Sequence, residues 1–195
     1  MKNNKTELAY LVALILGDGT VTKYYIRISD GKIENMRFVE KIFNKLDIKT
    51  HLKQENERKF ILEINSKKFI DYLKKNYGVV RGKKRRITIP KSIKSFKEIR
   101  AFMQGWFDAE GYLEKWKHPK TKIAYSRIRF GCKNKNVVLW LKTELEKLGI
   151  YVSKIWYNSK TYRFQIGQRK SVDSFLNLIG FRYPTKRPHF RDGKG

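Results

Sequence analysis

The segment FMQGWFDAEGYL, residues 102–113, has the apolar spacing of a helix but finishes on an acidic residue, Glu110, followed by Gly111. A carboxylate at the C-terminal end of a helix meets the negative end of the helix dipole, where it is unfavourable unless a cation lies nearby. The segment LVALILGDGTV, residues 11–21, has the same arrangement at Asp18. The pattern indicates two related helices, each ending on a carboxylate that needs a positive partner.

A tandem repeat surrounds these two segments. Residues 26–73 align with residues 128–175 at a constant offset of 102, and their apolar positions stay in phase. Within each copy, helical and alternating spacings predict a helix, two strands, a helix, two strands and a last helix. We therefore expect an α+β fold, a pseudo-two-fold tandem αββαββα repeat with two antiparallel four-stranded sheets. The expected halves are residues 1–77 and 96–195, joined by a basic linker at 78–95.

The same spacings predict the element boundaries. The expected helices are 6–17, 34–46, 67–76, 96–109, 136–148 and 170–179. The expected strands are 20–23, 25–29, 48–54, 58–65, 112–116, 123–131, 150–157 and 161–167. The second copy carries extra residues, KWKHPKTK at 115–122, which are interpreted as a longer hairpin loop. Ser95 and Glu98 have the spacing of a capping box at the start of the second motif helix.

The charge balance indicates a polyanionic partner. Lys and Arg number 45 against 18 Asp and Glu, a formal net charge of +27. Nucleic acid, an anionic membrane and a thermophile-type surface are the alternatives, and nucleic acid is favoured because thermophile surfaces interleave both signs of charge. The apolar run LAYLVALIL, residues 8–16, is too short to span a bilayer. A signal-peptide core is disfavoured there because Glu7 lies at its edge and the related stretch at 101–111 is internal.

The chain has one cysteine, Cys132, so an internal disulfide is excluded. This cysteine usage fits a reducing compartment. We expect a protein that is not secreted and has no membrane partner, located in the cytoplasm, or in an organellar matrix if it is organelle-encoded.

The predicted strands carry basic side chains on the face opposite their apolar residues, in both copies. In 25–29, for example, Ile26 and Ile28 alternate with Arg27. A solvated face is normal for an antiparallel sheet and remains the alternative for any one residue. On a curved sheet, however, Arg, Gln and Glu suit the guanine, adenine and cytosine edges of a major groove. The residues expected to contact DNA are Tyr25, Arg27, Ser29, Lys49, His51, Lys53, Lys59, Glu63, Arg85, Arg86, Arg127, Arg129, Ser153, Arg163 and Gln165.

Both motif helices place small residues four positions apart, Ala13 with Gly17 and Gly105 with Ala109. Residues at this spacing share one helix face, and small side chains there let two helices approach closely. Incidental small residues are the alternative, but glycine inside a helix costs about 1 kcal/mol relative to alanine. We therefore expect the two motif helices to pack against each other through these four residues.

Such packing would bring Asp18 and Glu110 together at the ends of two helix dipoles. Two carboxylates in that position repel each other unless a cation lies between them. The unpaired carbonyls of the last helical turn, such as those of Gly17 and Ala109, are further oxygen ligands. Carboxylates, carbonyls and water suit a hard cation, so the sequence predicts a Mg²⁺ or Mn²⁺ site.

The stretches LVALILGDG and MQGWFDAEG resemble the paired motifs of the single-chain LAGLIDADG homing endonucleases, and the resemblance covers most of the chain. It implies a saddle of two sheets over double-stranded DNA, with the motif helices between the halves. It also implies that Asp18 and Glu110 are catalytic and bind the metals, with the carbonyls of Gly17 and Ala109 as additional ligands.

The reaction implied is site-specific hydrolysis of both strands of a long asymmetric duplex site, leaving 3′ overhangs. Mg²⁺ would be the cofactor, with Mn²⁺ substituting and Ca²⁺ binding without supporting cleavage. Because both halves are in one chain, the resemblance implies a monomer.

Other positions match the resemblance less closely. Asp108 occupies the sixth position of the second motif, and the first motif has Leu16 there. The resemblance implies a structural role for this position, so Asp108 is not expected to be catalytic. Asp30 and Cys132 match a position near the scissile phosphate and are expected to contact DNA. Basic residues near the end of the fourth strand, Lys67 and Arg169, match a position that assists the attacking water or the phosphate, and are expected to be catalytic.

Two other functions stay open. One is an RNA-binding splicing factor of a group I intron, a maturase, on the same fold, for which the net charge of +27 is equally suitable. The other is a DNA-binding regulator without cleavage. Both acids are retained, which favours the endonuclease because binding alone does not need them.

Overall fold

The computed structural model describes residues 4–80, 87–117, 120 and 124–186, which form two αββαββα halves. In the first half the elements are α1 Lys5–Asp18, β1 Thr20–Val21, β2 Ile26–Asp30, α2 Ile33–Lys45, β3 His51–Asn56, β4 Lys59–Ile64 and α3 Lys67–Tyr77. In the second half they are α4 Phe96–Glu110, β5 Gly111–Lys117, β6 Ala124–Cys132, α5 Lys135–Lys147, β7 Trp156–Asn158, β8 Thr161–Ile166 and α6 Arg169–Leu178, followed by the 3₁₀ turn η2 Pro184–Lys186.

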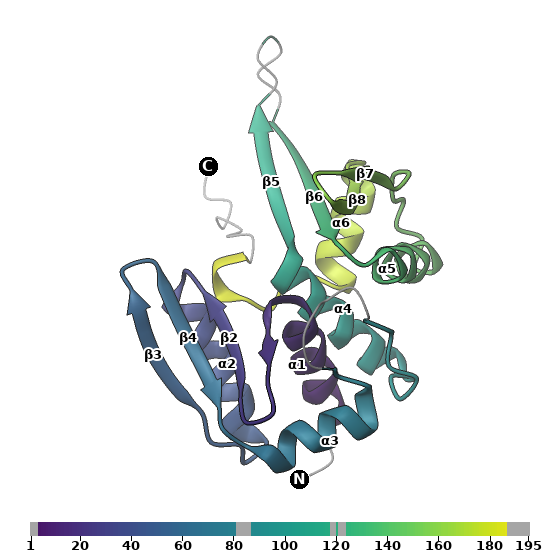
Figure 1. The fold of residues 1–195 in the computed structure, drawn as a ribbon. Helices are drawn as coiled ribbons and strands as arrows, with labels where there is room; N and C mark the ends of the chain where they lie inside the picture. The colour runs from purple at the N-terminus through teal and green to yellow at the C-terminus, as the bar shows by residue number, and fades with distance from the viewer. Residues whose placement is uncertain (1–3, 81–86, 118–119, 121–123, 187–195) are drawn as a thin grey trace.

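Each half contains one antiparallel four-stranded sheet. The strand orders are β1-β2-β4-β3 and β5-β6-β8-β7, so the second sheet repeats the topology of the first. The helices α1 and α4 lie at the centre of the molecule, between the two sheets (Figure 1). The predicted fold class is therefore confirmed.

The apolar face of each sheet is covered by helices and forms the core. Ile28 and Leu62 are opposite each other across β2 and β4 and are fully buried, as are Phe130 and Phe164 across β6 and β8. The alternate residues of these strands lie on the opposite face, where Arg27 and Arg129 are partly exposed. Strand alternation thus separates an apolar inner face from a polar outer one.

Several predicted boundaries are wrong. The strand expected at 150–157 is present only as Trp156–Asn158. Ile150 and Val152 are buried, but the segment before β7 does not form a continuous ladder with β8. Its Ser153 N–H donates to the Gln165 carbonyl at 2.9 Å, while the Gln165 N–H donates to the Ser153 hydroxyl at 3.0 Å. The expected loop at 115–122 begins later, because β5 continues to Lys117, while 118–119 and 121–123 lie outside the described residues.

The predicted capping box at the start of α4 is present. The Ser95 hydroxyl accepts the Glu98 N–H at 3.3 Å, and the Glu98 carboxylate accepts the Ser95 N–H at 2.9 Å. These bonds satisfy backbone donors that the first helical turn leaves unpaired.

The last described residues, 181–186, cross from the second half back to the first, and we call them the C-terminal strap. Its 3₁₀ turn η2 packs against α2 of the first half and is the yellow segment beside that half (Figure 1). The repeat pattern assigns these residues to the second half and gives no indication of such a crossing. Within the described parts of the chain, no helix has both the length and the apolarity needed to cross a membrane.

Candidate metal centre and nucleic-acid interface

The helices α1 and α4 are in close contact through their small residues. A side chain at Gly17 would overlap Ala109, and one at Gly105 would overlap the Tyr10 carbonyl oxygen and lie 2.8 Å from the Ala13 Cβ. The two helix axes therefore approach more closely than larger side chains would permit. This packing sets the C-terminal ends of the two helices next to each other.

Each of these helices ends on a partly buried acid and turns directly into a strand. The Gly19 N–H donates to the Ile15 carbonyl at 2.9 Å, and the Gly111 N–H donates to the Phe107 carbonyl. A side chain at Gly19 would overlap the Ile15 carbonyl oxygen, so this turn needs glycine for lack of space. Asp18 and Glu110 are therefore the last residues of the two helices, directly before the chain enters the first strand of each sheet.

A lysine that the motif pattern does not predict lies at these helix ends. The Lys186 ammonium donates to the Asp108 carbonyl and, at 2.8 Å, to the Gly111 carbonyl, at the C-terminal end of α4. Burial lowers the pKa of Lys186, and carboxylates oppose that lowering. These carboxylates, in decreasing order of effect, are Asp108, Asp18, Asp30 and Glu110. Lys186 is thus within electrostatic reach of both motif acids.

The chemistry of these helix ends fits a hard divalent cation. The donors available are two carboxylates and the carbonyls of two C-terminal helical turns, and oxygen ligands of this kind suit Mg²⁺ or Mn²⁺. The described residues contain no group of three or more His, Cys, Asp or Glu side chains placed to hold a metal. A cation bound here by Asp18 and Glu110 would therefore complete its coordination with backbone oxygens, water or the oxygens of a bound ligand.

Asp108 attaches the C-terminal strap to the helix pair. One of its carboxylate oxygens accepts the Tyr10 hydroxyl at 2.8 Å and the backbone N–H groups of Arg182 and Tyr183 at 3.0 Å each. Burial raises the pKa of Asp108 to about 6, against the lowering effect of these hydrogen bonds and of Lys186. Asp108 therefore has the structural role expected for the sixth motif position, and it holds the backbone that carries Lys186.

The strap is also bound to the first half. Arg182 forms an ion pair of 2.7 Å with Glu7 of α1. The Asn35 side chain accepts the Thr185 hydroxyl at 3.0 Å and donates to the Asp30 carboxylate at 3.2 Å. One chain of contacts thus links the strap, α2 and the end of β2, where Asp30 lies.

Lys67 and Arg169 are not at this site. Asp18 precedes β1, which pairs Thr20 with Arg27, while β4 ends at Ile64, opposite Ile26. Because β4 runs antiparallel to β2, its end at Ile64 and the following Lys67, the first residue of α3, lie toward the edge of the sheet away from Asp18. The second sheet has the equivalent register, with Phe130 between Gly111 and Phe164, so Arg169 extends away from Glu110 in the same manner. The register therefore does not place Lys67 or Arg169 at the helix ends, and their catalytic role stays a prediction; among the described residues, Lys186 is a basic residue that lies there.

The repeat points to this lysine only if its offset of 102 is continued beyond the aligned residues. Lys186 follows the last helix of the second half, and Lys84 stands 102 positions earlier. Lys84 lies outside the described residues.

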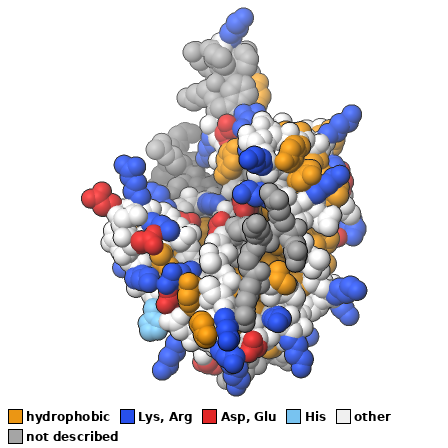
Figure 2. Space-filling model, viewed as in Figure 1, with side chains coloured by type: hydrophobic (Ala, Val, Ile, Leu, Met, Phe, Trp, Pro, Cys, Tyr) orange, Lys and Arg blue, Asp and Glu red, His pale blue; other side chains and the backbone are white. Residues whose placement is uncertain are grey.

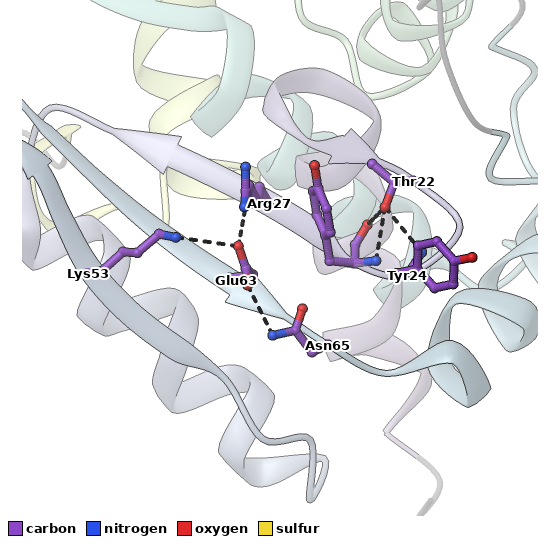
Figure 3. Close-up of polar contacts among 7 residues, drawn as sticks. Thr22, Tyr24, Arg27, Lys53, Glu63 and Asn65 are labelled. Carbon is purple, nitrogen blue, oxygen red and sulfur yellow. Dashed lines mark hydrogen bonds and ion pairs between the residues drawn. The ribbon is translucent and has the colours of Figure 1, made fainter.

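The outer face of the first sheet carries a linked group of polar side chains (Figure 3). The Glu63 carboxylate contacts the Arg27 guanidinium at 2.5 Å and the Lys53 ammonium at 3.6 Å, and it accepts the Asn65 amide at 3.0 Å. His51 is opposite Glu63 in the register of β3 and β4. Lys59 pairs with Glu55 at 2.6 Å near the β3–β4 turn. The first sheet thus presents basic side chains that are partly ordered by acids.

The second sheet has a related group on different strands. Glu114 of β5 forms ion pairs with Arg127 and, at 3.1 Å, with Arg129 of β6. Arg129 is opposite Gln165, as Arg27 is opposite Glu63. Lys and Arg side chains are spread over the face shown in Figure 2, with small acidic areas between them.

Most of the other residues expected to contact DNA are at least partly exposed. These are Tyr25, Ser29, Asp30, Lys49, Ser153 and Arg163. Cys132 is a correction, because its side chain is only 3% exposed and packs in the core of the second half. Arg85 and Arg86 lie outside the described residues.

The comparisons with known proteins agree on one family and one fold. The family model described as LAGLIDADG-like domain matches residues 5–78 and 97–180.

Two curated proteins of Methanocaldococcus jannaschii are similar to the chain. The isomerizing glutamine–fructose-6-phosphate aminotransferase is 26% identical over 197 residues, which cover 95% of this chain and 17% of that protein. The replication factor C small subunit is 27% identical over 195 residues, which cover 92% of this chain and 10% of that protein. The chain therefore spans only a small part of either relative.

Solved structures share the fold over nearly the whole chain. Full-length DUF199/WhiA from Thermatoga maritima superposes with a TM-score of 0.66 at 12% identity, covering 93% of this chain and 57% of that one. I-DmoI in complex with DNA and Mn superposes with a TM-score of 0.60 at 21% identity, covering 91% of this chain and 98% of that one. A complex of I-DmoI with DNA and Ca is similar, with a TM-score of 0.60 at 22% identity, covering 91% of each chain.

Proposed function

The chain belongs to the LAGLIDADG family, whose domain model matches both of its halves, and on this premise we propose that it is a site-specific double-strand DNA endonuclease of the homing type. The proposed reaction is hydrolysis of both strands of a long asymmetric duplex site with a divalent metal, leaving 3′ overhangs. Both halves of the DNA-binding saddle are in one chain, so the proposed active form is a monomer.

One observation carries this proposal: two helices end side by side, each on an acid, beside one partly buried lysine. Asp18 and Glu110 would hold the metal, with the carbonyls of Gly17 and Ala109 as further ligands. A bound Mg²⁺ supplies an activated water and neutralises charge on the cleaved phosphate. Mn²⁺ is expected to substitute, and Ca²⁺ to bind without cleavage.

Lys186 adds a fixed positive charge beside these acids. Its ammonium is held by two backbone carbonyls at the end of α4, so it is oriented before any DNA binds. Charge that is preorganised where a phosphoryl group reacts stabilises the transition state more than mobile charge does. We assign Lys186 the stabilisation of charge on the scissile phosphate.

The outer faces of the two sheets would hold the duplex. The basic residues of β2, β3 and β4 in the first half, and of β6 and β8 in the second, lie opposite the buried apolar faces. Neutralisation of phosphates by these residues releases counterions, so affinity should fall steeply with salt. A dependence that is flat between low and moderate salt would contradict the basic saddle.

The test uses the duplex made by joining the sequences that flank the coding segment of this chain. We expect the native protein to bind this duplex in Ca²⁺ and to cut both strands in Mg²⁺ or Mn²⁺. The matched control is Asp71→Asn, which removes an exposed acid of α3 and is expected to cut at the native rate. Binding without cleavage in any of the metals would contradict the endonuclease and favour a regulator. Binding to the flanking intron RNA instead of the duplex would favour the maturase.

A further inference from the structure

The Glu63 carboxylate on the outer face of the first sheet is occupied by its own neighbours. One oxygen contacts the Arg27 Nε at 2.5 Å, with the Lys53 ammonium at 3.6 Å from the same oxygen. The other oxygen accepts the Asn65 amide at 3.0 Å. The Glu63 side chain is only 15% exposed, whereas that of Arg27 is 40% exposed. Glu63 could contact a cytosine amino group only by giving up a partner that it already has.

The Arg27 guanidinium is held on two sides. Glu63 binds it at Nε, and the Tyr25 ring lies against it with 4.2 Å between the guanidinium carbon and the ring centroid. Tyr25 is fixed in turn by Thr22, whose hydroxyl accepts the Tyr25 N–H at 3.0 Å and donates to the Tyr25 carbonyl at 3.1 Å. Within the described part of the chain, no hydrogen bond or ion pair is made by the two terminal nitrogens of Arg27. Figure 3 shows this end of the guanidinium pointing away from Glu63.

This geometry differs from that of a surface ion pair that neutralises charge. An arginine held through Nε keeps the edge formed by its two terminal nitrogens, and that edge matches the O6 and N7 acceptors of guanine in a major groove. Holding the guanidinium in advance also reduces the rotamer entropy lost when the contact forms. Because the Lys53 ammonium shares the same carboxylate, the group keeps a net positive charge toward the DNA.

We propose that Glu63 is a positioning residue that presents Arg27 to a guanine in the major groove of one half-site, so that one G·C pair of the target is read by this pair of residues. The inference rests on the proposed function and deepens it by naming the base. Hydrogen bonds from Arg27 and Asn65 lower the pKa of the Glu63 carboxyl to about 2, so the carboxylate is ionised at every pH at which the protein would be assayed.

The test is selection of bound duplexes from a random double-stranded library in Ca²⁺, followed by sequencing. The native protein is expected to select a long motif that contains a guanine, and Arg27→Lys is expected to lose that guanine by roughly tenfold in preference. Glu63→Gln keeps the shape of the side chain, removes its charge, and is expected to weaken preference for the same base pair while preferences at the other positions persist.

The matched control is Glu55→Gln. It removes one negative charge from the same sheet, at the ion pair with Lys59, 2.6 Å, and leaves the Arg27 contacts intact. Its motif is expected to equal the native motif, with the guanine retained. If both charge removals changed the motif alike, a general electrostatic effect would replace the positioning role.

Two further results would overturn the inference alone: a motif unaffected by Glu63→Gln, or a change at a cytosine elsewhere in the site, which would make Glu63 itself the base reader. A native protein that selects no duplex motif overturns both the inference and the proposed function.

Discussion

The ammonium of Lys186 lies 2.8 Å from the carbonyl oxygen of Gly111, the residue that directly follows Glu110. The strap that carries this lysine is fixed by Asp108, two residues before Glu110, and by contacts to the first half. The same short segment thus joins the two halves and supplies a positive charge at the ends of their central helices.

Replacing Lys186 by methionine is expected to slow cleavage by roughly 10²- to 10³-fold, because a preorganised positive charge near the reacting phosphate is lost. Binding of the duplex in Ca²⁺ should change little, since one charge among many is removed. Single-turnover cleavage and equilibrium binding measure the two effects. Lys147→Met, at an exposed residue paired with Glu144 at 2.8 Å, is the matched control. Equal cleavage by Lys186→Met and Lys147→Met would remove the role assigned to Lys186.

The stability of the protein is expected to depend on pH through Asp108. Burial raises the pKa of this carboxyl from its ordinary 3.8 to about 6. The folded state therefore holds the proton more tightly than the unfolded state, and the free energy of unfolding contributed by this group falls as pH rises from about 4 to about 6. Denaturant unfolding across this range should show the decline in the native protein and lose it in Asp108→Asn. A decline of the same size in the variant would assign it to another group.

The contact between α1 and α4 predicts a reversal of the usual effect of alanine in a helix. Alanine normally stabilises a helix by about 1 kcal/mol relative to glycine. At Gly105, the new Cβ would overlap the Tyr10 carbonyl oxygen and lie 2.8 Å from the Ala13 Cβ, so Gly105→Ala should destabilise the fold. We expect a loss of about 1–3 kcal/mol, measured by denaturant unfolding. Gly167→Ala, where nothing lies within 4 Å of the added atom, is the control. A stabilised Gly105→Ala variant would show that the helices do not pack closely.

The second half predicts a guanine that mirrors the one assigned to Arg27. Arg129 occupies the position equivalent to Arg27, and its acid, 3.1 Å from Nε, is Glu114 of β5, while one of its terminal nitrogens donates to the Tyr112 hydroxyl at 3.4 Å. Glu114→Gln should therefore weaken selection of a G·C pair at the mirrored position, with the guanine on the opposite strand. Selection from the random duplex library measures this preference position by position. Loss of preference at the Arg27 position instead would contradict the assignment of the two sheets to the two half-sites.

The sequence predicted the fold because its apolar positions repeat in phase, and alternation such as that of Ile26, Arg27 and Ile28 defines both faces of a strand. Alternation did not predict where β7 begins, since Ile150 and Val152 are buried without a continuous ladder of hydrogen bonds. Periodicity also carries no information about the strap, whose contacts with Asn35 and Asp108 are made between distant parts of the chain.

The candidate site was predicted only where its residues follow a regular spacing along the chain. Gly17 and Gly105 could be found because a helix contact needs small residues at a regular spacing. Lys67 and Arg169 were misplaced because the direction of β4 and β8 relative to the helix ends depends on strand register, which the sequence does not show. Predicting Lys186 as a site residue would require knowing that the strap crosses back to the first half and that it partly buries this side chain.

The most direct measurement is the single-turnover rate of duplex cleavage in Mg²⁺ by the double variant Asp18→Asn with Glu110→Gln, beside its affinity for the same duplex. The metal assignment predicts that the variant binds the duplex and cuts neither strand, because both metal-holding carboxylates are gone. Cleavage by the double variant at the native rate would contradict it.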